Sequence, residues 1–340
     1  MLKVSDFDYV LPLELIAQRP SPVRDESRLL VLDRATGHIE HREFKDLTYF
    51  LTPADLLVLN DTRVIPARLR GKKKTGGKVE VLLLRRIMSD VWEALVNPAR
   101  GAGVGVEISF GEGKLIGKIV DRTEAGTRVI DFKYKGNFWN LLAKLGETPL
   151  PPYIKEDLEE KERYQTIYAK KEGASAAPTA GLHFTEDLIE RIKEKGIRVC
   201  FITLHTGLAT FRPVKEEFVQ NHKMYREHYE IGEEAAAEIN DTKATGGRII
   251  AIGTTTVRAL ESAYRDGEVK SGSEETGLFI YPGYKFKVAD AIITNFHFPK
   301  STLLMLVSAF ARRELIFKAY EEAIKKEYRF YSFGDAMLII

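Results

Sequence analysis

A stretch of small residues ending in a histidine is the first place where this sequence could do chemistry. In residues 164–185, YQTIYAKKEGASAAPTAGLHFT, the segment 173–181 is built from Gly, Ala, Ser, Thr and Pro. Such residues let a backbone lie close to a ligand but cannot build a core. His183 follows between apolar neighbours, which makes it a candidate acid–base group. A plain connector with a buried, hydrogen-bonded His183 explains the stretch equally well.

Four apolar runs elsewhere in the chain end in polar side chains. LLVLN leads to Asp61, IRVCFITL to His205, RIIAIG to threonines 254–256, and AIITN to His297. If these runs are parallel strands, their ends lie along one edge of a sheet, where open α/β architectures bind ligands. The four ends together therefore predict a catalytic or ligand-binding cleft. At Asp61 alone, an Asx-turn that closes the strand is the alternative.

The turn after RIIAIG has the chemistry of an anion- or hydroxyl-binding site. Gly253, Thr254 and Thr255 present backbone N–H groups and hydroxyls at a predicted helix start. Arg258 and Glu261 are three residues apart on that helix and share a face. The other candidates for substrate contact lie in the small-residue stretch, beside the last strand end or near the C-terminus: Thr179, Gly181, Asn295, Lys300, Ser301 and Asp335. Ser301, after Pro299, is also ordinary helix-start chemistry.

Residues 64–150 differ in residue pattern from the rest of the chain. Short alternating segments such as KVEVLLLRR and TRVIDFKY are separated by Gly-rich turns, which predicts a small antiparallel β-barrel or sandwich. Its first turn has no acidic residue between Arg63 and Lys78. The basic residues proposed to contact an RNA backbone are Arg24, Arg63, Arg68, Arg70, Lys72, Lys73 and Lys74. A solvated hairpin tip is the alternative.

Residues 1–63 and 151–340 are predicted to form the main domain. Helix and strand alternate there, as in TEDLIERIKEK followed by IRVCFITL, which indicates an α/β fold with a mixed or parallel sheet or a barrel-like core. The smaller β-barrel is predicted to be inserted into it. A length of 340 residues is enough for two domains.

Composition narrows the classes of protein. The net charge is +2, which argues against bulk electrostatic binding of nucleic acid but allows a local basic face. Cys200 is the single cysteine, so no internal disulfide forms and the cytoplasm is expected. The longest strongly apolar helix candidate, 302–311, is too short to span a membrane. The seven scattered histidines predict no metal site, and a P-loop, GxGxxG, GxSxG or HExxH motif is absent.

Taken jointly, six segments resemble one known family. LIAQRPSPVRDESRLL, LLVLNDTRVIPARL, the 164–185 stretch, GTTTVRALES, FHFPKSTLLMLVSAF and YRFYSFGDAML are similar to the S-adenosylmethionine:tRNA ribosyltransferase-isomerase family of queuosine biosynthesis. The resemblance implies transfer and isomerisation of the ribosyl group of S-adenosylmethionine onto 7-aminomethyl-7-deazaguanine at the tRNA wobble position. Epoxyqueuosine-tRNA, adenine and methionine are the implied products. S-adenosylmethionine is then a consumed substrate and no cofactor or metal is expected.

That reaction assigns roles to the candidate residues. It needs a base for the carbon next to the sulfonium, a proton for departing adenine and a deprotonated amine. His183, His205 and His297 are the candidates, with Asp61 as carboxylate partner, and His183 or His297 is the predicted base. Arg258 and Glu261 are predicted to hold the methionine carboxylate and amine, and the Thr254 turn the ribose hydroxyls. Arg63 and the basic residues of 68–78 are predicted to contact the anticodon stem-loop, and a monomer is expected.

Five positions differ from the family pattern, which leaves the roles of their loops open: Thr206, Ala209, Tyr225, Phe298 and Arg312. Two other classes of function compete with the transferase. One is a non-catalytic RNA-binding module that reads RNA through the basic β-domain. The other is an RNA-independent nucleotide- or sugar-processing α/β enzyme.

Overall fold

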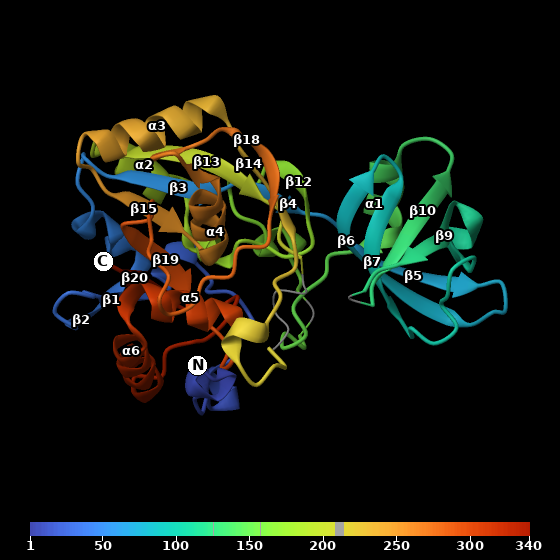
Figure 1. Ribbon diagram of the computed structural model, residues 1–340, viewed down its shortest axis with the longest axis horizontal. Coiled ribbons are helices and arrows are strands. Elements are labelled where there is room, and N and C mark those ends of the chain that lie inside the picture. The colour runs from blue at the N-terminus through green and yellow to red at the C-terminus, as the bar shows by residue number, and fades with distance from the viewer. Residues whose placement is uncertain (125, 157, 208–213) are drawn as a thin grey trace.

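The computed structural model describes residues 1–124, 126–156, 158–207 and 214–340. Figure 1 shows two parts beside each other, a larger α/β part that contains both chain ends and a smaller β-barrel. Two short parallel strands, β4 (Thr62–Val64) and β12 (Lys171–Ala174), lie on the side of the α/β part that faces the barrel (Figure 1).

The α/β part is built on a nine-stranded mixed sheet in the order β18-β14-β13-β3-β15-β19-β20-β1-β2. Its strands are β1 (Arg28–Leu32), β2 (Ile39–Glu43), β3 (Leu56–Asn60), β13 (Arg198–Leu204), β14 (Glu227–Ile231), β15 (Ile249–Ile252), β18 (Gly272–Thr276), β19 (Ala291–Asn295) and β20 (Ala336–Ile339). The four apolar runs of the sequence are β13, β3, β15 and β19, which are consecutive and mutually parallel. Their polar carboxyl ends therefore lie at the same edge of the sheet.

Helices cover both faces of this sheet, which explains why its central strands are continuously apolar. Alternate residues of each strand face different cores. On one side Leu56, Val58 and Ile249 pack with helices α3 (Glu233–Ala244), α4 (Thr254–Ala263), α5 (Thr302–Ala311) and α6 (Arg313–Lys325). On the other side Leu57 and Leu59 pack with α2 (Glu186–Glu194) and with the 3-10 helices η4 (Phe44–Phe50) and η7 (Thr179–His183). A small hairpin, β16 (Tyr264–Arg265) and β17 (Glu268–Val269), follows α4.

The smaller part is a closed antiparallel barrel, as the alternating pattern predicted, and not a sandwich. The order β5-β6-β7-β10-β9-β8 is closed by pairing of β8 with β5, and β11 adds to β5. The elements are β5 (Arg68–Lys73), β6 (Lys78–Met88), β7 (Val91–Asn97), β8 (Glu107–Phe110), β9 (Leu115–Arg122), β10 (Arg128–Tyr134), α1 (Phe138–Leu145) and β11 (Gly146–Glu147). Trp92, Phe110, Phe132 and Phe138 fill the interior. These elements lie inside the range 64–150, whose limits as a domain stay a prediction.

In the described parts of the chain, no helix combines the length and the apolar character needed to cross a lipid bilayer.

Candidate active site

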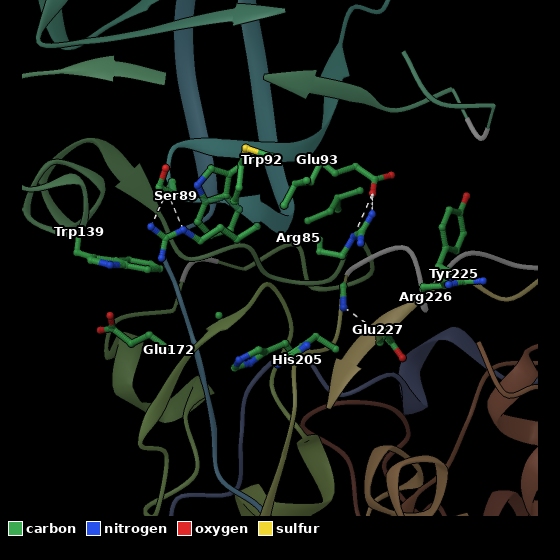
Figure 2. Close-up of a pocket in the computed structure, with 17 residues that line it drawn as sticks. Arg85, Ser89, Trp92, Glu93, Trp139, Glu172, His205, Tyr225, Arg226 and Glu227 are labelled. Atoms are coloured by element: carbon green, nitrogen blue, oxygen red, sulfur yellow. Dashed lines mark hydrogen bonds and ion pairs between the residues drawn. The ribbon is translucent and has the colours of Figure 1, made fainter. Parts of the chain in front are cut away.

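A pocket of about 450 Å³ lies where the barrel meets the α/β part (Figure 2). The barrel contributes residues 84–89 of strand β6 and the loop after it, together with Trp92, Glu93 and Trp139. The α/β part contributes Glu172, Gly173, His205, Gly207 and residues 225–228. Arg85 donates to Glu275 of β18 and so ties the two parts together beside the pocket. A volume of this size is typical of small-molecule and cofactor sites.

A second, smaller pocket of about 50 Å³ lies at the carboxyl ends of the parallel strands. Thr206 lines this pocket, whereas His205 and Gly207 line the larger one, so residues 205–207 separate the two. Its wall includes the candidates Thr179, Gly253, Thr254, Thr255, Asn295 and His297. The strand-end argument therefore brought these residues together in one place.

His205 faces the larger pocket from the end of β13. Its Nδ1 lies 2.7 Å from the hydroxyl oxygen of Thr62, and its ring stacks on that of His228 at 5.9 Å. One face of the ring lies against Gly173, where an added Cβ would lie 2.7 Å from Nε2 and 2.8 Å from each carbon beside it. Burial, followed by repulsion from His228, lowers the pKa of His205 to about 4. The ring is therefore neutral at pH 7 and can accept a proton.

His183 is held inside a closed hydrogen-bond network. Its Nδ1 lies 2.7 Å from the Ser27 hydroxyl, and that hydroxyl donates to the carbonyl of Arg24. Its Nε2 lies 3.2 Å from the Asn295 amide nitrogen, and the ring stacks on Phe44. The Ser27 hydroxyl hydrogen goes to the Arg24 carbonyl, so Nδ1 carries a hydrogen and donates it to the hydroxyl oxygen. The Asn295 amide nitrogen can only donate, so Nε2 accepts. Burial lowers its pKa to about 4. These contacts match the alternative of a buried, hydrogen-bonded histidine.

His297 lines the smaller pocket, with its Nε2 2.8 Å from the Thr294 hydroxyl. Burial lowers its pKa to about 3, so this ring is also neutral. Asp61 accepts a hydrogen bond of 2.6 Å from Thr203, and burial raises its pKa. Among the described residues, no hydrogen bond joins Asp61 to any of the three histidines. The residue next to it, Thr62, makes the contact with His205 instead.

The Gly-Thr-Thr-Thr turn starts α4 as the sequence predicted. Gly253 has φ +91°, a conformation that glycine adopts without strain. The Thr255 hydroxyl accepts a hydrogen bond of 3.3 Å from Asn60, whose amide also donates to the carbonyl of Leu204. Asn60 thus links the ends of β3 and β13 to the start of α4 and holds the three elements together.

Arg258 and Glu261 lie on one helix, but each has partners of its own in this structure. Arg258 pairs with Glu227 of β14 and donates to the carbonyl of Leu278. Both charges are buried, with exposed side-chain fractions of 3% and 5%. Glu261 accepts from the hydroxyl of Tyr284 and from three backbone N–H groups in a neighbouring loop, those of residues 287–289. Its carboxylate is therefore saturated, and neither side chain lines either pocket.

Glu227 is a site residue that sequence reasoning missed. It lines the larger pocket and accepts from the backbone N–H of Gly207 at 3.3 Å while it pairs with Arg258. It therefore holds one end of the 205–207 segment. The signal in the sequence was its place two residues after Tyr225, which departs from the family pattern. Tyr225 also lines the larger pocket.

Four more candidates have structural contacts. Lys300 pairs with Asp8 at 2.6 Å, and Ser301 caps α5 by accepting from the N–H of Leu304 at 3.1 Å. Asp335 accepts from the backbone N–H groups of Arg28 and Arg329 and pairs with their side chains. At Gly181 an added Cβ would lie 2.1 Å from the hydroxyl oxygen of Tyr168, so the position requires glycine. These contacts favour folding roles over substrate contact.

Most of the predicted RNA-binding cations have acidic partners from other segments. The pairs are Arg63–Glu162 at 2.6 Å, Arg68–Glu80 at 3.7 Å, Arg70–Glu147 at 3.1 Å and Lys74–Glu107 at 2.7 Å. Lys73 donates to the carbonyl of Gly101, and Arg24 to that of Leu182. The absence of acids between residues 63 and 78 thus did not give an unpaired basic surface, because neighbouring strands supply the acids. Lys72 has no ion pair among the described residues.

The departures from the family pattern fall in different settings. Phe298 stacks on Tyr331 at 3.7 Å in the wall of the smaller pocket. Arg312 joins α5 to α6 with φ +63° and ψ 139°. Ala209 lies outside the described residues. No group of three or more His, Cys, Asp or Glu side chains that could hold a metal ion is found within the described ranges. A metal-free site stays a prediction.

The closed barrel, the mixed sheet with polar strand ends and the pocket between them define a two-part α/β protein with a cavity at the junction of its parts. Residues 4–339 match the family model described as queuosine biosynthesis protein. The chain therefore belongs to the queuosine biosynthesis protein family.

Named relatives and a solved structure are similar over nearly their whole length. Proteins named S-adenosylmethionine:tRNA ribosyltransferase-isomerase from a Thermoanaerobacter species and from Clostridioides difficile are 58% and 57% identical. The alignments cover 100% and 99% of this chain and 100% of each relative. A crystal structure of S-adenosylmethionine tRNA ribosyltransferase from Thermotoga maritima is 40% identical, with a TM-score of 0.58. That match covers 99% of this chain and 100% of the other.

Proposed function

We propose that this protein transfers and isomerises the ribosyl group of S-adenosylmethionine onto 7-aminomethyl-7-deazaguanine at the wobble position of tRNA. The products are epoxyqueuosine-tRNA, adenine and methionine. The observation that carries the proposal is full-length identity of 57–58% to relatives named for this activity. The competing readings as an RNA-binding module or an RNA-independent enzyme have no such support.

The two adjoining pockets suit a reaction between two substrates. Threonine hydroxyls and backbone N–H groups line the smaller pocket, and these are suitable partners for ribose hydroxyls. At about 50 Å³ this pocket is too small for a whole S-adenosylmethionine. Since residues 205–207 lie between the pockets, the reacting groups meet beside this segment.

We favour His205 as the base that removes a proton from the carbon next to the sulfonium. Its Nδ1 is engaged by Thr62, which leaves Nε2 at the larger pocket. By contrast, both ring nitrogens of His183 have partners, and His297 faces the smaller pocket. A ring with a pKa of about 4 is a weak base. The positive sulfur must therefore supply much of the acidification of the carbon.

The decisive experiment is incubation of the protein with S-adenosylmethionine, with and without tRNA that carries the modified base. RNA-dependent release of adenine is expected. Binding of RNA without turnover would favour the non-catalytic module, and turnover without RNA would favour the small-molecule enzyme. Deuterium exchange at the ribose 5′ carbon then tests the base. Loss of exchange is expected for His205→Ala, and full exchange in that variant would refute the assignment.

We also propose that the protein acts as a monomer in the cytoplasm. Light scattering after size-exclusion chromatography tests the monomer, and a dimer whose dissociation abolishes turnover would contradict it.

A further inference from the structure

The barrel wall of the larger pocket carries an aromatic ring paired with a guanidinium group. Trp139, at the start of α1, lines the pocket and is half-buried. The Arg86 guanidinium lies 5.7 Å from the centre of its ring. Arg86 in turn donates to the carbonyl of Ser89 at 2.8 Å, which fixes its position (Figure 2). The Trp139 ring and the Arg86 guanidinium are therefore two flat groups in the pocket wall, and the position of Arg86 is fixed by hydrogen bonds.

Exposed apolar side chains lie beside this wall. Ile87 and Met88 line the pocket at the end of β6, and their exposed fractions are 41% and 63%. Both side chains therefore add apolar surface to the lining of the cavity. Because the ring of Trp139 continues the same wall, the surface suits flat, partly apolar groups such as nucleotide bases.

The charges that line the pocket are mixed, with Arg85, Arg86 and Arg226 on one side of the balance and Glu93, Glu172 and Glu227 on the other. Arg86 has no ion pair among the described residues, and Arg226 on the opposite wall has a side chain that is 75% exposed. The nearest acid to Arg226 is Glu275 at 3.8 Å, and Glu275 is also the partner of Arg85. The two walls thus offer weakly compensated cations, whereas Lys74 and Arg70 on the β5–β6 hairpin have acidic partners.

The hairpin and the pocket are at opposite ends of one strand. Strand β6 begins at Lys78 beside the hairpin and reaches the pocket at Leu84. At about 3.3 Å per residue this separation is roughly 20 Å. A single folded RNA can span it, with phosphate contacts at the hairpin and base contacts at the pocket.

We propose that the wall formed by Trp139, Arg86, Ile87 and Met88 binds unpaired RNA, with the base next to the reacting one stacked on Trp139. Arg86 and Arg226 then face the flanking phosphates. The inference rests on the proposed function, because an enzyme that modifies a base in a loop must receive it unstacked from its neighbours. Single-stranded RNA is generally held by stacking on aromatic rings and on arginine planes.

Binding of a labelled anticodon stem-loop RNA, followed by fluorescence anisotropy, tests the proposal without turnover. Trp139→Ala is expected to weaken binding about 5- to 150-fold, the range for loss of one base–aromatic stack. Trp139→Phe retains a ring and should bind within a few-fold of the wild type. Tyr49→Ala is the matched control, since Tyr49 is an aromatic residue with an exposed fraction of 76% outside the pocket.

Trp139 also contacts Trp92 and Phe138, so Trp139→Ala can disturb the fold of the barrel. Met88→Asp avoids this problem because Met88 is exposed, and its new charge should weaken RNA binding in the same assay. Wild-type affinity in Met88→Asp, or in a folded Trp139→Ala, would overturn the inference. So would equal binding of a fully paired RNA duplex. If the wild type binds the stem-loop as expected and the variants weaken binding, but no adenine is released, the RNA-binding wall is supported while the proposed function fails.

Discussion

Gly173→Ala is the substitution that tests most directly whether the position of the His205 ring matters. Gly173 lines the larger pocket, and an added Cβ would lie 2.7 Å from Nε2 and 2.8 Å from both ring carbons beside it. Carbon atoms in contact normally lie about 3.5 Å or more from their neighbours. The methyl group must therefore displace the ring by roughly 0.8 Å.

The magnitude follows from the displacement of the ring, which the 2.7 Å contact of Nδ1 with the Thr62 hydroxyl otherwise holds in place. A reacting group misplaced by about 1 Å costs on the order of 100-fold in rate, which is about 2.7 kcal/mol of transition-state stabilisation. Overpacking is expected to lower the free energy of unfolding by about 1–3 kcal/mol.

The assay is RNA-dependent release of adenine, measured together with urea unfolding. Gly103→Ala is the control, because a Cβ at Gly103 meets nothing within 4 Å. If His205 is the affected group, Gly173→Ala should lower the rate little further in a His205→Ala background. A Gly173→Ala protein with wild-type turnover, or with the same loss in both backgrounds, would refute the role given to this ring.

Three further predictions concern stability and are measured by urea unfolding. Glu227→Ala leaves Arg258 buried without its partner and should lower the free energy of unfolding by about 3–5 kcal/mol. Glu274→Ala removes only the exposed pair with Arg265 and should lower it by under about 1 kcal/mol. Similar losses in the two variants would contradict the argument from burial. Burial lowers the pKa of His183 from 6.5 to about 4, so the unfolded chain binds more protons in between. The free energy of unfolding should then fall by up to about 3 kcal/mol as the pH drops from 6.5 to 4. If His183→Gln shows the same dependence of this free energy on pH, His183 is not its cause. Arg312→Gly relieves a positive φ and should stabilise the fold by about 1 kcal/mol, whereas Glu321→Gly inside α6 should destabilise it by a similar amount. A loss of stability in both variants would contradict the strain at Arg312.

The parallel strands and the barrel were predictable because their signals are local. LLVLN, IRVCFITL, RIIAIG and AIITN are short apolar runs bounded by polar residues, and the barrel segments alternate with a period of two. Parallel neighbours also have to place their carboxyl ends together. This constraint alone predicts that His205, the Thr254 turn and His297 lie at one edge of the sheet.

The contacts of individual side chains were not predictable, because they depend on segments far apart in the chain. Arg258 pairs with a residue 31 positions earlier, and Glu261 accepts from a loop 23–28 positions later. Spacing along one helix could place both on a shared face but could not show that each already had partners. The acids beside Arg68, Arg70 and Lys74 likewise come from β6, β11 and β8, whose register with β5 is set by closure of the barrel.

The pairing of β11 with β5 has a consequence for the order of folding during synthesis. Arg68 pairs with Glu147 and Leu69 with Gly146, so the chain leaves the α/β part and returns to it at one place. Every strand of the barrel has been made once Glu147 leaves the ribosome. Strand β3 must still wait for β13 and β15, which lie more than 50 and 100 residues further on. The barrel can therefore fold first. Its folding brings the chain before the barrel, which contains β3, close to the chain after it, which contains β13 and β15.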